Sequence, residues 1–387
     1  MRTITAAKLW DGSQLLDNPI LTIEDGYVAS IRSGTATGEH HFPGATLAPA
    51  FFDVHIHGSA GHDVMEATPD ALGKIGRFLA SRGTGNYLAT TVTAPLEMTL
   101  RALDGLAKLI DHPDSIPSNA PTTKPIGIHL EGPFLSHAKC GVQPKEHLLA
   151  PDIATFDRLY EAAGGHARLM TLAPELPGAV ELAAHATSRG VRVSVGHSDA
   201  KAAETKAAIA AGAVSATHTF NAMRALDHRE PGILGTVLTT ASLYAELICD
   251  GIHSDPAIAS LWWRAKGPER GILITDAMSA AGMPDGEYTL GGFAVQVANG
   301  RAMARGVLAG SVLTLDRALA NFTQFSGAPL DQALRLLTVN PAAMTGFSNQ
   351  TGSISVGALA NLVAVDAQGK LIASFHHGEL ASSAQEN

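Results

Sequence analysis

Eight short apolar segments alternate with helical patterns along the chain, and this alternation limits the possible folds more than any other feature. The segments span residues 51–57, 86–91, 126–131, 168–173, 191–197, 213–218, 244–249 and 271–276. They are apolar almost throughout, which is typical of parallel strands buried on both faces. The pattern predicts an α/β fold, a (β/α)8 TIM-type barrel. A doubly wound open sheet is the alternative, but no Gly-x-Gly-x-x-Gly follows a first strand.

Two intervening helices have clear boundary signals. For residues 69–81, Thr68 is the expected N-cap, Pro69 occupies the first turn and Gly83 follows the end. For residues 199–211, Asp199 is the expected cap and Gly212 follows. These signals place helices between strands, as a barrel requires.

The two ends of the chain differ from the middle. Short strands are expected at residues 20–24 and 27–31, and again at 360–366 and 371–375, each pair flanking a turn. We expect the ends to pair into a small β-sandwich domain of residues 1–48 plus 349–387, leaving 49–348 as the barrel. Residues 382–387 are expected to form a frayed tail.

Composition excludes several classes of protein. The net charge of −9 argues against a nucleic-acid partner, and it means that an anionic ligand needs a local cationic pocket. Cys140 and Cys249 are too few and too distant for a disulfide framework. The N-terminus lacks an apolar signal segment, and no stretch of 18 uncharged apolar residues suggests a membrane span. We therefore expect a cytoplasmic protein with no membrane partner.

Ionisable residues recur where the predicted strands end. The set is His55 and His57 after the first segment, Glu131 after the third, His197 after the fifth, His218 after the sixth and Asp276 after the eighth. In a barrel these ends share one rim. Burying so many ionisable groups without compensation is very costly, and a metal cluster removes that cost. The pattern therefore predicts a metal site.

Several motifs resemble the amidohydrolase superfamily, in particular its deacetylases of phosphorylated amino sugars. They occur in the family's order and extend over the chain: PAFFDVHIHG at 49–58, HLEGPF at 129–134, VGHS at 195–198, HTFNAM at 218–223, REPG at 229–232, DGIH at 250–253, TDA at 275–277 and LAGS at 308–311. Members of this family also place both termini in a small β-sandwich beside the barrel.

The resemblance implies one or two divalent metal ions, foremost zinc, with iron, manganese or cobalt as alternatives. Glu131, His197 and His218 resemble the ligands of the metal found in all members. His55 and His57 resemble the pair that holds a second metal, with Glu131 bridging. Asp276 resembles the catalytic acid–base and a possible further metal ligand.

The implied reaction is hydrolysis of the acetamide of N-acetyl-D-glucosamine 6-phosphate to D-glucosamine 6-phosphate and acetate, a step of amino-sugar catabolism or cell-wall recycling. The galactosamine epimer is the alternative substrate. Less favoured alternatives are another amidohydrolase activity or a catalytically weakened relative.

The resemblance also implies substrate contacts and a homodimer in which phosphate contacts cross the interface. The residues that match such contacts are Val142, Asn221, Ala222, His228, Arg229, His253, Leu308, Ala309 and Gly310. From the residues alone, the favoured interpretation of Arg229 is a loop arginine paired with Glu230.

Gln143 is where the chain departs from the pattern, because relatives usually have a histidine there that polarises the acetyl carbonyl. A glutamine amide can donate a hydrogen bond, but it cannot carry positive charge. Three explanations stay open: a natural variant with altered substrate preference, an engineered change, or carbonyl polarisation by the metals instead. We place Gln143 with Asp276 as a catalytic candidate.

Overall fold

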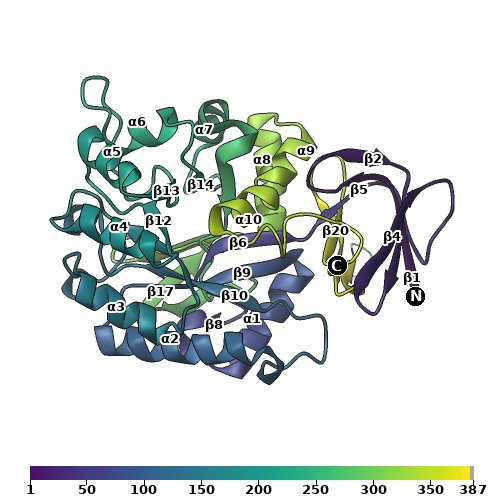
Figure 1. Cartoon of the computed structure of the whole chain (residues 1–387), viewed down its shortest axis with the longest axis horizontal. Helices are drawn as coiled ribbons and strands as arrows, with labels where there is room; N and C mark the ends of the chain where they lie inside the picture. Colours follow the sequence, from purple (N-terminus) through teal and green to yellow (C-terminus); the bar gives the residue numbers. More distant parts are fainter. Residues whose placement is uncertain (384–387) are drawn as a thin grey trace.

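A computed structural model describes residues 1–383 and shows a helix-wrapped parallel barrel beside a β sheet that contains both ends of the described chain (Figure 1). The predicted fold class, a TIM-type barrel with a small β domain from both termini, is confirmed. The division at residues 48 and 349 stays a prediction.

The barrel has eight parallel strands and closes on itself. The strands are β6 (Phe51–Ile56), β9 (Thr84–Thr91), β10 (Pro125–Glu131), β11 (Ala167–Leu172), β12 (Arg192–Val195), β13 (Ala213–Ala216), β14 (Ala245–Ile248) and β15 (Gly271–Ile274). Six form one sheet in the order β13-β12-β11-β10-β9-β6, and β14 pairs with β15. Ala216 N donates to Tyr244 O at 3.0 Å at one seam, and Asp276 N donates to His55 O at 2.9 Å at the other. All eight strands therefore end on one rim.

Helices cover the outside of the barrel. They are α1 (Pro69–Ser81), α2 (Leu96–Asp111), α3 (Ile153–Ala162), α4 (Ala179–Ser188), α5 (Ala202–Ala210), α6 (Gly232–Thr239), α7 (Pro256–Arg270), α8 (Leu315–Ser326), α9 (Leu330–Arg335) and α10 (Val339–Thr345). Short 3-10 turns occur at Val64–Glu66, Pro113–Ser115, His137–Lys139 and Lys145–His147.

One predicted helix boundary is confirmed and one is wrong. The Thr68 hydroxyl accepts from Ala71 N and caps α1 as expected. Helix α5 begins only at Ala202, so Asp199 is not its cap. The Asp199 carboxylate instead pairs with Arg224 at 2.8 Å, which holds the rim loop beside His197.

The terminal sheet joins the two ends of the described chain through β5. Its strands are β1 (Arg2–Trp10), β2 (Leu15–Asp17), β3 (Pro19–Glu24), β4 (Tyr27–Ser33), β5 (His40–Pro49), β20 (Leu362–Val365), β21 (Leu371–His376) and β22 (Glu379–Ser383). Strand β5 pairs in parallel with β1 and antiparallel with β20. The expected frayed tail is wrong for residues 382–383, because they belong to β22 and Ser382 Oγ donates to Ser81 O. Residues 384–387 lie outside the described residues.

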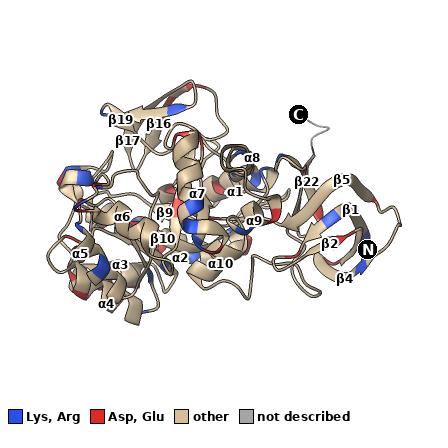
Figure 2. Ribbon diagram, turned by 90° about the horizontal axis from the view of Figure 1, so that it is seen from above, with Lys and Arg blue, Asp and Glu red and all other residues tan. Residues whose placement is uncertain are grey.

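An antiparallel sheet that the sequence did not predict follows β15. It consists of β16 (Gly286–Leu290), β17 (Phe293–Ala298), β18 (Arg301–Ala304) and β19 (Val307–Leu308), and it projects from the barrel in Figure 2. A small hairpin, β7 (Gly58–Ser59) with β8 (His62–Asp63), lies beside it, and Asp63 accepts from Gly291 N at 2.8 Å.

Charged residues of both signs are interspersed along the ribbon in Figure 2. Within residues 1–383, no helix has both the length and the apolar character needed to cross a membrane.

Gly76 tests how closely α1 packs on the barrel. A Cβ at this position would collide with the carbonyl oxygen of Thr123 and lie 2.8 Å from the Thr122 methyl group. Helix propensity alone would make Gly76→Ala stabilising by about 1 kcal/mol. We expect overpacking to dominate and the substitution to cost about 2 kcal/mol of unfolding free energy in chemical denaturation. Lys74→Ala, on the exposed side of the same helix, is the control and should stay within ~0.5 kcal/mol. A stabilised Gly76→Ala variant would contradict this packing.

Candidate active site

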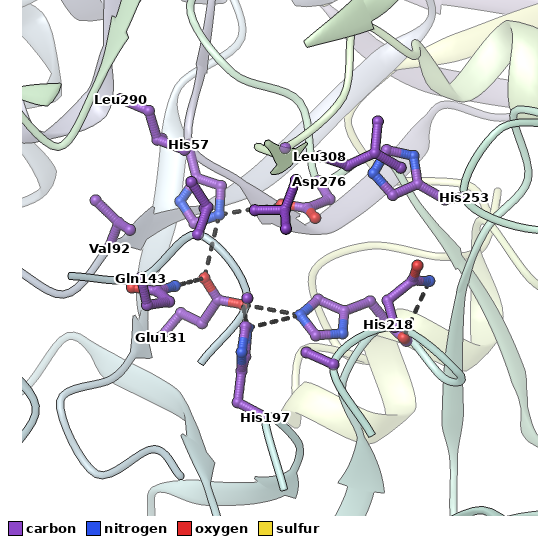
Figure 3. A pocket seen from close by; sticks show the side chains of 16 residues that line it. His57, Val92, Glu131, Gln143, His197, His218, His253, Asp276, Leu290 and Leu308 are labelled. Carbon is purple, nitrogen blue, oxygen red and sulfur yellow. Dashed lines mark hydrogen bonds and ion pairs between the residues drawn. The ribbon is translucent and has the colours of Figure 1, made fainter. Parts of the chain in front are cut away.

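Six ionisable side chains from five strands or the residues just after them converge at one rim of the barrel, and Figure 3 shows five of them, all but His55. They are the six predicted metal-site residues, His55, His57, Glu131, His197, His218 and Asp276, and each is at most 8% exposed. His55 and Glu131 belong to β6 and β10, and the other four directly follow strands β6, β12, β13 and β15. The barrel thus brings together residues up to 221 positions apart, from 55 to 276.

Glu131 is the common partner in this cluster. Its Oε1 atom lies 3.4 Å from His55 Nε2, 3.2 Å from His197 Nε2 and 3.1 Å from His218 Nε2. Its Oε2 atom lies 3.4 Å from His57 Nε2. The donors form two triads, His55–His57–Glu131 and Glu131–His197–His218, and within each triad the ligand atoms lie within 4.8 Å of one another. The geometry offers two adjacent metal positions with a shared carboxylate.

The histidine tautomers fit metal binding. His57 Nδ1 lies 3.0 Å from Thr90 O, and His197 Nδ1 lies 3.0 Å from Lys139 O. A carbonyl only accepts, so in the neutral form that can bind a metal Nδ1 carries the proton and the Nε2 lone pair faces the cluster.

The contacts inside the cluster also call for a cation. His197 Nε2 and His218 Nε2 are 3.0 Å apart, and His55 Nε2 is buried without a hydrogen bond. Without a metal, one of these two nitrogens must carry a proton and donate to the other, whereas a bound cation would accept both lone pairs. Imidazole and carboxylate donors suit zinc, iron, manganese or cobalt, so the residues fit a divalent metal.

The buried charges depend strongly on one another. Burial lowers the pKa of His57, but hydrogen bonds with Asp276 and Glu131 outweigh it and raise the pKa to about 9. Burial raises the pKa of Asp276, but His55 and His57 outweigh it and lower the pKa to about 2. The pKa of Glu131 is likewise held well below its usual range, against burial, by His55, His197 and His218. The cluster therefore holds two ionised carboxylates among histidines, a ready cation site.

Three of the six side chains are aimed by unusual backbone. His197, His218 and Asp276 have φ values of 45°, 28° and 50°, in the left-handed region. Non-glycine residues there cost about 1–3 kcal/mol, and such strain clusters at functional sites. The preceding residue fixes the backbone at Asp276. Thr275 Oγ1 donates to the buried Asp53 carboxylate at 2.6 Å. Burial raises the pKa of Asp53 to about 7, against its hydrogen bonds from Thr275 and His55 N.

A cavity of about 250 Å³ opens over the cluster, close to the lower limit for small-molecule sites. Of the predicted substrate contacts, those that line it are Val142, Asn221, Ala222, His253, Leu308 and Gly310. Ala309 is buried behind the lining, and its N–H donates to Ala302 O. His228 and Arg229 are exposed on the loop between β13 and α6 and do not line the cavity. The structure thus brings six of the nine together and leaves His228, Arg229 and Ala309 apart.

Gln143 lines the cavity with both ends of its amide engaged. Its Nε2 donates to Glu131 Oε2 at 2.6 Å, and its Oε1 accepts from Thr93 N at 2.8 Å. One Nε2 hydrogen therefore remains for a ligand. The side chain is fixed on the central carboxylate, next to His57 and Val92 (Figure 3).

Sequence reasoning missed several residues of the site. The cavity is also lined by Val92, Leu290 and Val307, the last two from the β16–β19 sheet. Glu246 lies fully buried in β14 beside His55, 3.3 Å from its Nδ1. A lone carboxylate inside the apolar segment 244–249 was the available signal for Glu246. Leu290 and Val307 gave no such signal, because the sequence does not show that the β16–β19 sheet lies over the rim.

Fold and cluster together define a barrel protein with a buried histidine–carboxylate metal site. The model of the amidohydrolase family matches residues 46–383, so the chain belongs to this metal-dependent family.

Several relatives match over nearly their whole length. An N-acetylgalactosamine-6-phosphate deacetylase of Escherichia coli O157:H7 is 38% identical over 98% of this chain and 99% of its own. An N-acetylglucosamine-6-phosphate deacetylase of Vibrio furnissii is 35% identical over 98% of this chain and 94% of its own. A mutant N-acetyl-D-glucosamine-6-phosphate deacetylase of Mycobacterium smegmatis, solved with N-acetyl-D-glucosamine 6-phosphate, superposes with a TM-score of 0.91 at 35% identity, covering 98% of this chain and 99% of that one.

Removal of single ligands should separate the two metal positions. We expect the unmodified protein to bind two zinc equivalents, and His55→Ala and His197→Ala to bind one each, because each variant disrupts a different triad. Elemental analysis after dialysis against a weak chelator gives the stoichiometry. His185→Ala, a helix histidine paired with Asp157 away from the cluster, is the control and should retain two. Two equivalents in both ligand variants would contradict the two-triad interpretation.

Proposed function

We propose that this chain is a metal-dependent hydrolase that removes the acetyl group from N-acetyl-D-glucosamine 6-phosphate, giving D-glucosamine 6-phosphate and acetate. The observation that carries the proposal is the pair of triads around Glu131, with Asp276 beside them on the cavity wall. Full-length relatives named as deacetylases of amino-sugar 6-phosphates support the substrate class.

In the proposed reaction, water attacks the acetamide carbonyl and Asp276 moves the proton. The bound divalent ion would supply Lewis acidity, polarising the carbonyl oxygen and making water more acidic. Asp276 Oδ1 lies 3.1 Å from His57 Nε2 on the cavity wall, where the ionised carboxylate can accept the proton. Asp276 would then deliver that proton to the departing amine, which completes cleavage of the C–N bond. The free Nε2 hydrogen of Gln143 is placed to donate to the carbonyl oxygen.

The lining of the cavity suggests how the sugar phosphate lies. Val92, Gln143 and Leu290 lie at the His57 side of the cluster, whereas His253 and Leu308 lie on the other side (Figure 3). His253 Nδ1 is held by Asp250 at 2.7 Å, so its other nitrogen can face an anion. We therefore place the acetamide near Gln143 and the phosphate near His253.

A phosphate dianion calls for more positive charge than one imidazole supplies. Among the described residues that line the cavity, none is lysine or arginine. Arg229 is exposed instead, on a loop held by Asp227, which accepts from Arg229 N and Glu230 N. We propose that Arg229, with His228 beside it, completes the phosphate site of a second copy of the chain, in a cytoplasmic homodimer. Its guanidinium fork suits two phosphate oxygens.

N-acetyl-D-galactosamine 6-phosphate is the second candidate substrate. The relative from Escherichia coli O157:H7 carries that name, and it matches as completely as the glucosamine enzymes. The two sugars differ in the configuration of one hydroxyl group.

Acetate release from both epimers, with and without the 6-phosphate, tests the substrate and the role of Arg229. Arg229→Ala should lower kcat/KM for the phosphorylated sugar by at least tenfold and leave the slow reaction of the unphosphorylated sugar unchanged, because it removes a phosphate contact. Arg192→Ala, at the start of β12 on the opposite rim, is the control. Equal loss with both sugars would refute the phosphate role.

Mixed dimers test whether Arg229 acts across an interface. A pool of Arg229→Ala and Asp276→Asn subunits, refolded together, should regain activity because one subunit supplies Asp276 and the other supplies Arg229. No recovery would place Arg229 in its own subunit's site.

Gln143→His tests the departure from the family pattern. A neutral histidine can accept from Thr93 N through its Nδ1 lone pair, as Gln143 Oε1 does now, and donate from Nε2–H. A doubly protonated histidine gives up the Thr93 contact but adds a positive charge beside the carbonyl oxygen. We expect kcat to rise several-fold in steady-state assays with little change in KM. Gln143→Asn, which keeps the amide but shortens the reach, should lower kcat. Unchanged or lower kcat in Gln143→His would show that Gln143 is no handicap.

A further inference from the structure

Glu246 is a buried carboxylate to which the proposed reaction assigns no step. It lies in the middle of β14, and it is 0% exposed. Within residues 1–383, no lysine or arginine forms an ion pair with Glu246. Its ion-pair partner there is His55. A buried carboxylate without a cationic partner is costly, so its contacts must compensate.

Glu246 contacts one histidine residue from each of the two triads. Glu246 Oε2 lies 3.3 Å from His55 Nδ1 and accepts from His218 N at 3.2 Å. The second oxygen, Oε1, is buried with no hydrogen-bond partner. A carboxylate can only accept a hydrogen bond, so neutral His55 carries its proton on Nδ1, which donates to Glu246. The Nε2 lone pair of His55 then faces Glu131.

His55 differs from the other ligand histidines in what orients it. His57 and His197 each face a backbone carbonyl, of Thr90 and Lys139, and His218 Nδ1 has no partner. His55 is the one oriented by a carboxylate. A carboxylate behind a ligating imidazole raises its basicity and fixes its ring, and loss of such a partner typically costs 10–100-fold in metal affinity.

We propose that Glu246 is a positioning residue that sets the metal affinity of the His55–His57–Glu131 position, without touching the metal or the substrate. The inference rests on the metal cluster of the proposed function. It does not rest on the substrate, so it survives if the chain proves to hydrolyse something else.

Zinc affinity in two backgrounds tests the proposal. In His197→Ala protein the His55–His57–Glu131 triad is intact, and in His55→Ala protein the Glu131–His197–His218 triad is intact. We expect Glu246→Ala to weaken zinc binding 10–100-fold in the first background and to leave it unchanged in the second, measured by competition with a chromophoric chelator. Equal affinity in the first background would overturn the proposal. An equal loss in both would also overturn it, because Glu246 would then act through His218 N or the barrel as a whole.

Conservative variants separate orientation from charge. Glu246→Gln can accept the same hydrogen bond from His55 Nδ1 without the negative charge, so it should lose less affinity than Glu246→Ala. Should Glu246→Ala fail to fold, Glu246→Gln in the same two backgrounds decides the matter by the same comparison. The visible spectrum of bound cobalt gives a second measurement that does not depend on turnover: it should change with Glu246 in the His197→Ala background only.

Discussion

The geometry of the site depends on one buried carboxylate, that of Glu131. Four imidazoles and the amide of Gln143 surround its two oxygens at 2.6–3.4 Å, and they come from the strands and loops around one rim. Burying a carboxylate charge costs free energy, and hydrogen bonds and opposite charges around it must offset that cost. Displacing a single strand would therefore remove part of the compensation for this buried charge, so closure of the barrel and assembly of the site depend on one another.

Positioning within this shell is divided between backbone and side chains. Left-handed backbone at His197, His218 and Asp276 turns these residues inward directly after their strands. Within β6, by contrast, regular strand geometry already places His55 inside, and Glu246 only has to fix the rotation of its ring. The two triads thus reach the shared Glu131 by different means.

Much of this arrangement could be predicted from the sequence, because strand ends in a barrel lie on one rim whatever the loops do. That rule was sufficient to bring His55 together with Asp276 across the chain. It could not show that Arg229 lies outside the cavity, since loop direction depends on Asp227 and Glu230 contacts that have no periodic signal. It also could not predict the β16–β19 sheet over the rim, or that Asp199 pairs with Arg224 rather than capping α5.

The charge balance connects oligomeric state with substrate recognition. The chain carries a net charge of −9, and its cavity wall has acidic side chains but no lysine or arginine among the described lining residues. Metal ions held by the residues around Glu131 would offset the acidic end of the cavity, whereas the proposed phosphate site lies beside His253. Under the proposed function a further cation comes from outside the cavity, and Arg229 is exposed on a loop whose backbone donates to Asp227. A second copy that inserts this arginine would make phosphate binding depend on assembly, so a monomer would keep its metal chemistry and lose its preference for phosphorylated sugars.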